Sequence, residues 1–157
     1  MIRPLTAASL LLCLVSLPGC VTGPGTGALL PVGDPEVFAA EVQPVLAAGC
    51  SNPSCHGNAG RPLEVYAPFM HRLDPDRVHL DEPITEAELV LNRLRAAAFL
   101  RDCDDPDLSA LLTKPLAPAA GGCEHTGGTV YEDDSEPDYQ TLRAWASEAI
   151  DEAGRSQ

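Results

Sequence analysis

The sequence predicts an all-α fold, a small helical domain with long irregular loops. Apolar residues recur at helical spacing in three segments, near residues 34–49, 85–101 and 137–150. This periodicity is typical of amphipathic helices. Residue types that are common at helix N-termini stand at the start of each segment. Between the segments lie residues 57–84 and 113–136, which show no sustained helical pattern.

The first helix is expected to begin at Asp34, whose side chain can cap it, with Pro35 at the first helical position. Its apolar residues stand at positions i, i+4, i+7 and i+8 and predict one buried face: Phe38, Val42, Val45 and Leu46. Gly49 is expected to end the helix. Cys50 should therefore lie at its C-terminal end.

A capping box from Thr85 to Glu88 predicts the start of a second helix. We expect this helix to end near Arg101, ahead of an acidic turn. Its apolar residues form one predicted stripe: Ala87, Val90, Leu91, Leu94 and Ala98.

Two further helical segments are expected in the C-terminal half. A short turn passes through Leu111 and Leu112, capped by Ser109 or Asp107 and ended by Lys114-Pro115. The last helix should begin around Pro137, after a cap at Ser135 or Asp134. Its predicted buried face has Trp145 on the flank and consists of Tyr139, Leu142, Ala146, Ala149 and Ile150.

The loops between the helices are long for a compact domain, and such loops usually wrap or bind something. Apolar residues of the first loop could line a pocket, namely Leu63, Val65, Tyr66, Phe69 and Met70. Ordinary surface loops with local contacts are the alternative. The apolar pattern at residues 63–66 is brief, and a short strand there is an alternative to an irregular loop.

The N-terminus predicts an exported lipoprotein. Residues 1–19 combine one basic residue with a short apolar run, typical of a signal peptide, and end in a lipobox whose Cys20 would carry lipid. Residues 20–33 are rich in glycine and proline and predict a flexible tether. The domain is expected at residues 34–151, followed by a polar tail, 152–157. A secreted protein cut elsewhere, with a stray thiol at Cys20, is the alternative.

Charge restricts the partners of the chain. The formal net charge is −13, and removal of residues 1–19 takes away one arginine and leaves about −14. Nucleic acid and anionic lipid surfaces are therefore poor partners. The acidity would favour a redox partner protein with a basic face, or it would simply keep an exported protein soluble.

Two cysteines closed by a histidine, Cys50, Cys55 and His56, form the most specific motif. Covalent haem c requires two thiols and an adjacent imidazole, although the usual gap between the thiols is two residues and here it is four. Cys13 leaves with the signal peptide and Cys20 carries lipid, so four of the six cysteines remain in the domain. If haem takes Cys50 and Cys55, a disulfide joins the other pair, Cys103 and Cys123.

Two haem-free alternatives use the same residues. Cys50 could pair with Cys55 in a second disulfide, which would give a stapled interaction module in an oxidising compartment. Alternatively, two thiolates and two imidazoles, from Cys50, Cys55, His56 and His125, could hold zinc.

The order of these features resembles the cytochrome c fold. An amphipathic helix leads into Cys50, Cys55, His56 and Gly57, an irregular wrap follows, and an aromatic-bearing helix ends the domain. The resemblance implies that the first and last helices cross, with an aromatic contact between Phe38 and either Tyr139 or Trp145.

Further stretches at residues 109–116, 121–128 and 137–145 resemble predicted cytochrome-c-like domains of bacterial exported lipoproteins. The similarity covers residues 34–151. The four-residue gap between the cysteines departs from most members, although some multihaem cytochromes use it.

The resemblance implies a set of iron ligands. His56 would be the proximal ligand, and His125 is the first distal candidate because it lies in a glycine-rich loop before the last helix. Met70 is the second candidate, ahead of His71 and His79. His125 could also merely bond its own loop. The expected function is one-electron transfer at the bacterial cell envelope, by a carrier rather than a catalyst.

Overall fold

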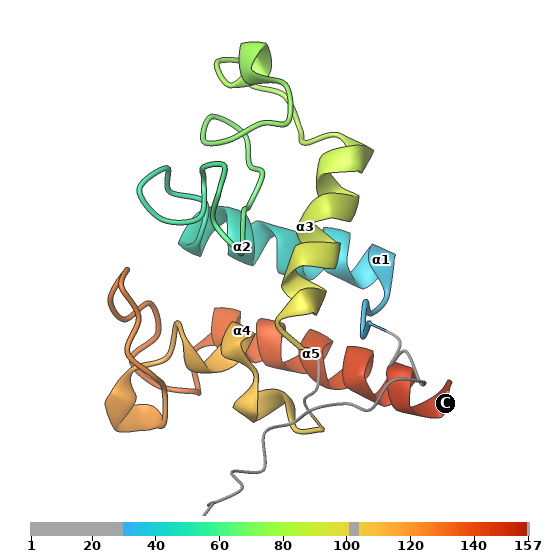
Figure 1. Ribbon diagram of the computed structural model, residues 1–157, viewed down its shortest axis with the longest axis vertical. Coiled ribbons are helices and arrows are strands. Elements are labelled where there is room, and N and C mark those ends of the chain that lie inside the picture. Colours follow the sequence, from blue (N-terminus) through green and yellow to red (C-terminus); the bar gives the residue numbers. More distant parts are fainter. Residues whose placement is uncertain (1–29, 101–103, 157) are drawn as a thin grey trace, which may run out of the picture.

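The computed structural model describes residues 30–100 and 104–156 and shows a helical protein (Figure 1). Within these residues, β-structure is limited to two isolated bridges, Ala67 with His71 and Leu116 with Tyr131. The all-α prediction is confirmed, and residues 63–66 form no strand. The predicted signal peptide and Cys20 lie outside the described residues, as does most of the tether.

The N-terminal helix is continuous in three parts, α1 (Pro35–Val37), η1 (Phe38–Val42) and α2 (Gln43–Gly49). Asp34 caps it as predicted, since its carboxylate accepts from the backbone nitrogens of Glu36 and Val37. The middle part is a π-helix, in which the Gln43 nitrogen donates to the Phe38 carbonyl. Pro44 follows the π-helix and has no N–H, so it cannot donate the i to i−4 hydrogen bond of an α-helix.

Helix α3 (Glu86–Ala98) begins with the predicted capping box of Thr85 and Glu88 and is capped at its end by Phe99. Its predicted apolar stripe was wrong, because Val90 and Leu94 are exposed. The buried residues of α3 are Glu88, Asn92, Ala96 and Ala97. This face of α3 is buried because Glu88 and Asn92 form hydrogen bonds with Arg72 and the Tyr66 carbonyl. The helix ends at Ala98, three residues before the predicted end near Arg101.

Short elements connect α3 to the last helix: η3 (Pro106–Leu108), α4 (Ala110–Thr113) and η4 (Pro118–Ala120). Ser109 precedes α4 and Lys114 follows it, as predicted. Helix α5 (Pro137–Arg155) also begins where expected, but Glu136 takes the cap position. The predicted cap at Ser135 was wrong, because this residue bonds Asp133 instead.

Helix α5 packs against the N-terminal helix and forms the centre of the core (Figure 1). The rings of Phe38 and Trp145 meet edge to face with centroids 5.3 Å apart, which is a favourable aromatic geometry. Trp145 is therefore a core residue rather than a flanking one. Tyr139 packs against Tyr131 instead.

Gly33 permits the chain to pass over this aromatic pair. Its φ is +59°, and a Cβ at this position would lie 2.5 Å from Nε1 of Trp145. Only glycine combines this backbone conformation with so close an approach.

Residues 67–84 form a projection that we call the lobe, beyond the N-terminal end of α3 (Figure 1). It contains η2 (Pro75–Arg77), which Asp74 caps by accepting from the Asp76 nitrogen. No helix of the described residues has both the length and the apolar character needed to cross a membrane.

Candidate functional site

A cavity of about 270 Å³ lies where the end of α2 meets α4, α5 and the loop of residues 121–130. Most of its walls are apolar: Leu46, Pro62, Leu63, Phe99, Leu111, Pro115, Val130 and Leu142. The side chains with polar atoms in its lining are Cys50, Cys55, His56, Lys114 and His125. The structure therefore gathers both cysteines of the motif and two of the predicted histidine ligands around one cavity.

A compact turn accommodates the four-residue gap between the cysteines. Cys50 caps the C-terminal end of α2, and the Asn52 carbonyl accepts from the nitrogens of Cys55 and Gly57 at 2.8 and 2.9 Å. The His56 nitrogen donates to the Cys50 carbonyl at 3.2 Å. The two additional residues are thus absorbed in a hydrogen-bonded turn, and both thiols still line the cavity.

Gly57 is required for this turn. A Cβ at residue 57 would lie 1.8 Å from the carbonyl oxygen of Ser51, far inside any real contact. The glycine that follows the histidine therefore has a steric role in keeping the cysteine turn closed.

His56 presents an imidazole suited to bind a metal. Burial lowers its pKa, and the backbone of Leu63, which acts in the opposite direction, does not offset this. His56 is therefore neutral at neutral pH, which is the form that ligates metals. Its Nδ1 atom is buried and has no hydrogen-bond partner in the structure. Such an atom is costly to leave unpaired.

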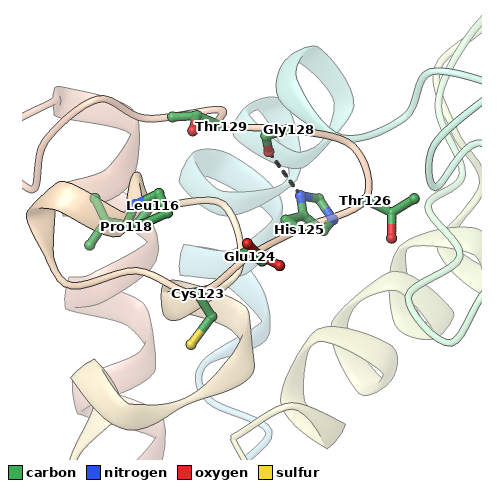
Figure 2. A pocket seen from close by; sticks show the side chains of 8 residues that line it. All are labelled: Leu116, Pro118, Cys123, Glu124, His125, Thr126, Gly128 and Thr129. Carbon is green, nitrogen blue, oxygen red and sulfur yellow. Dashed lines mark hydrogen bonds between the residues drawn. The ribbon is translucent and has the colours of Figure 1, made fainter.

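His125 faces His56 across the cavity. The two rings are 10° from parallel, with centroids 5.8 Å apart. Nδ1 of His125 bonds the Gly128 carbonyl at 3.2 Å (Figure 2), which leaves Nε2 for another ligand. The hydrogen bond to its own loop, which was the alternative expectation for His125, is confirmed, and the role of His125 as a distal ligand stays a prediction.

The motif cysteines are both free thiols. Burial, reinforced by the neighbouring Cys55, raises the pKa of Cys50 to about 11. Cys50 is therefore a thiol and not a thiolate at neutral pH, whereas zinc binds the thiolate. In the described part of the chain, no group of three or more His, Cys, Asp or Glu residues is arranged to hold a metal ion.

The other predicted ligands lie elsewhere. Met70 does not line the cavity and is exposed, and His79 is exposed too. His71 bonds Glu64 at 2.7 Å and stacks on Tyr66. Of the apolar loop residues predicted to line a pocket, Leu63 does so, whereas Phe69 and Met70 point to solvent.

A second, more open pocket of about 480 Å³ is lined by residues of the 121–130 loop together with Leu116 and Pro118 (Figure 2). His125 lines both pockets, and the exposed Cys123 lines the open one. The predicted partner of Cys123, Cys103, lies outside the described residues.

Lys114 is a cavity residue that sequence reasoning missed. It is exposed, but its Nζ donates to the Glu124 carbonyl at 3.1 Å and its side chain lines the edge of the cavity. No pattern in the sequence distinguishes this lysine from any surface lysine.

Comparisons with the models of known protein families, with the curated proteins and with the solved structures found no match. The function therefore has to be inferred from the cavity and the side chains that line it.

Proposed function

We propose that this protein is a lipid-anchored, cytochrome-c-like electron carrier with one haem c bound through Cys50 and Cys55. The observation that carries the proposal is the meeting of four side chains at one apolar cavity. Two thiols and one imidazole come from the turn after α2, and a second imidazole comes from the loop before α5. This donor set is the one that a covalent haem with two axial histidines requires.

The chemistry of the cavity suits haem better than a bare metal ion. Its walls are largely apolar, which fits a flat, hydrophobic ligand. Cys50 and Cys55 are free thiols, which is the form that a thioether link to each of the two vinyl groups of haem would require. The partnerless Nδ1 of His56 is a second sign of an incomplete site.

The cavity is small for a haem, so the proposal requires the loop of residues 121–130 to move outward when haem binds. The loop of residues 121–130 is exposed along most of its length. Backbone hydrogen bonds at its ends join Cys123 to Thr113 and Val130 to Pro115, and the Lys114 side chain donates to the Glu124 carbonyl. The tip that carries His125 lies beyond these bonds.

Each side chain has a defined role in the proposal. Cys50 and Cys55 would hold the haem covalently, and the imidazoles of His56 and His125 would be its iron ligands. When bound, haem supplies a one-electron ferric/ferrous couple. Leu46, Leu111 and Leu142 exclude water, and this burial tunes the potential.

The setting of the electron transfer follows from the charge and the N-terminus. A net charge of −13 favours a redox partner with a basic face and disfavours nucleic acid. Lipid on Cys20 would hold the protein at the bacterial cell envelope. The haem-free stapled module gains no support from Cys50 and Cys55, which are not paired with each other.

The test is an absorption spectrum of the full chain, oxidised and reduced, from cells that carry the haem-attachment machinery. We expect a covalent haem signal that is lost in Cys55→Ser and in His56→Ala. His125→Ala should keep the haem, change its spectrum and open a position for added imidazole. His79→Ala, at an exposed histidine, is the matched control and should change nothing. A wild-type protein without haem would refute the proposal.

A further inference from the structure

The lobe of residues 67–84 displays large apolar side chains to solvent. Phe69, Met70, Leu73 and Leu80 are each between 42% and 54% exposed. None of them lines the cavity that holds His56. A gathering of exposed apolar side chains on one projection is typical of a surface that binds a partner.

The backbone at Phe69 is strained. Its φ is +62°, and it is the one non-glycine residue with a positive φ among those that the structure describes. The residue lies in a tight turn in which Ala67 and His71 exchange backbone hydrogen bonds of 2.9 and 3.2 Å. Glycine would occupy this conformation without steric cost. A large, exposed aromatic side chain at such a position contributes little to the interior, so its contribution lies outside the molecule.

A rigid frame supports the lobe. The buried Arg72 donates to Glu88 through Nε and Nη2, both at 3.0 Å. It also donates to the carbonyls of Glu82 and Pro83, at 3.2 and 3.1 Å. The Leu73 nitrogen donates to Glu88 at 2.8 Å. Arg72 and Glu88 thus join both ends of the 72–83 segment to α3, and a frame ordered in advance loses little entropy on binding.

The rim of the lobe is acidic. Leu73 and Leu80 are each followed directly by an exposed aspartate, Asp74 and Asp81, and Asp76 is exposed as well. The two arginines of the lobe are already paired, Arg72 with Glu88 and Arg77 with Glu82. The exposed Leu73 and Leu80 therefore each precede a carboxylate, and both arginines of the lobe already have acidic partners.

We infer that the lobe docks a partner protein that offers an apolar pocket with a rim of lysine and arginine. Phe69 and Met70 are the apolar anchors, and the aspartates provide electrostatic steering. The lobe of a second copy would carry the same negative charge, and so would an anionic membrane, so a basic protein is the occupant that the charge favours. This inference goes beyond electron transfer and holds whether or not the cavity carries haem.

The test places a photo-crosslinking amino acid at residue 69 of the full chain, in the cells that produce the protein. The matched control places it at residue 108, because Leu108 is apolar, 74% exposed and outside the lobe. We expect one crosslinked product at residue 69 that is absent at residue 108. Its partner should be a basic protein, and its yield should fall in high salt and with Asp74→Asn and Asp81→Asn combined.

The inference would be overturned by equal products at both positions, by crosslinks to a second copy or to lipid alone, or by no product. A second variant separates docking from folding. Phe69→Gly should raise Tm by a few degrees, because it relieves the strained φ, and should weaken binding to the captured partner at least tenfold. A lower Tm, or unchanged binding, would contradict the inference.

Discussion

The cavity around His56 and the lobe of residues 67–84 differ in whether their buried polar groups have hydrogen-bond partners. In the cavity the walls are apolar, and the buried Nδ1 of His56 lacks a partner. Inside the lobe, the guanidinium of Arg72 pairs with Glu88 and also donates hydrogen bonds to two backbone carbonyls. The apolar side chains of the lobe face solvent.

If both proposals are correct, the difference separates a site that would receive a ligand from a surface that would dock a partner. A buried polar atom without a partner is incomplete until something binds to it. A saturated ion pair needs nothing further and serves to hold the exposed side chains in place. The predictions below test this contrast, first at the lobe and then at the cavity.

The largest effect is expected from breaking the buried pair with Arg72→Met. This change leaves the Glu88 carboxylate buried without its partner, and the loss of folding free energy should be about 3–5 kcal/mol. The double variant Arg72→Met with Glu88→Leu should recover most of it, because both charges are then gone. Guanidinium unfolding of the variants measures this. A loss below about 1 kcal/mol in Arg72→Met would show that the pair does not hold the lobe.

The next effect is a loss of stability in acid. Burial alone would raise the pKa of Glu88, but hydrogen bonds from Arg72, Thr85 and Leu73 outweigh it and lower the pKa from 4.5 to about 2. The stabilisation is therefore complete above pH 4.5 and is lost as the pH falls toward 2, and it amounts to about 3 kcal/mol.

Urea unfolding between pH 2 and pH 6 tests this dependence. Glu88→Gln should be less stable at pH 6 and should show a flatter profile in the acidic range. Equal slopes for the wild type and Glu88→Gln would mean that another carboxylate controls the acid response.

A smaller effect is expected at the cavity from Gly57→Ala. The added Cβ would meet the Ser51 carbonyl at 1.8 Å, so the turn must open, at a cost of about 1–3 kcal/mol. Haem incorporation should fall as well, because both thiols depend on this turn. Gly154→Ala, where a Cβ meets nothing within 4 Å, is the control and should gain roughly 0.5–1 kcal/mol. Normal haem content and stability in Gly57→Ala would contradict the role of the turn.

The smallest effect is expected at Arg143 and Asp107. This pair has the same bidentate chemistry as the buried pair, at 2.6 and 2.7 Å, but both side chains are more than 40% exposed. Arg143→Met should cost less than about 1 kcal/mol, and the cost should shrink in high salt. Thermal unfolding at low and high salt measures it. A cost equal to that of Arg72→Met would remove burial as the explanation of the difference.

Local signals in the sequence predicted the helix starts well. The caps at Asp34 and Thr85 depend on residues within one turn, so the sequence carries the necessary information. The meeting of Phe38 with Trp145 could be anticipated only through a resemblance to a known fold, because their contact joins distant segments.

Apolar periodicity failed where polar side chains turn inward. The buried face of α3 is set by Glu88 and Asn92, which bond Arg72 and the backbone of Tyr66. Both partners lie in a loop without regular structure, so the pattern of α3 alone could not identify them. The same limit applies to the cavity, because the order of residues along the chain does not show that His125 faces His56 while Met70 does not.

Covalent haem is the central claim, and the intact mass of the denatured full chain tests it most directly. The protein would be purified from cells that carry the attachment machinery and compared with the double variant Cys50→Ser with Cys55→Ser. We expect the wild type to be heavier by one haem, beyond the difference due to the substitutions. A wild type whose mass is explained by its amino acids alone, or which is two hydrogens lighter through a disulfide between Cys50 and Cys55, would contradict it.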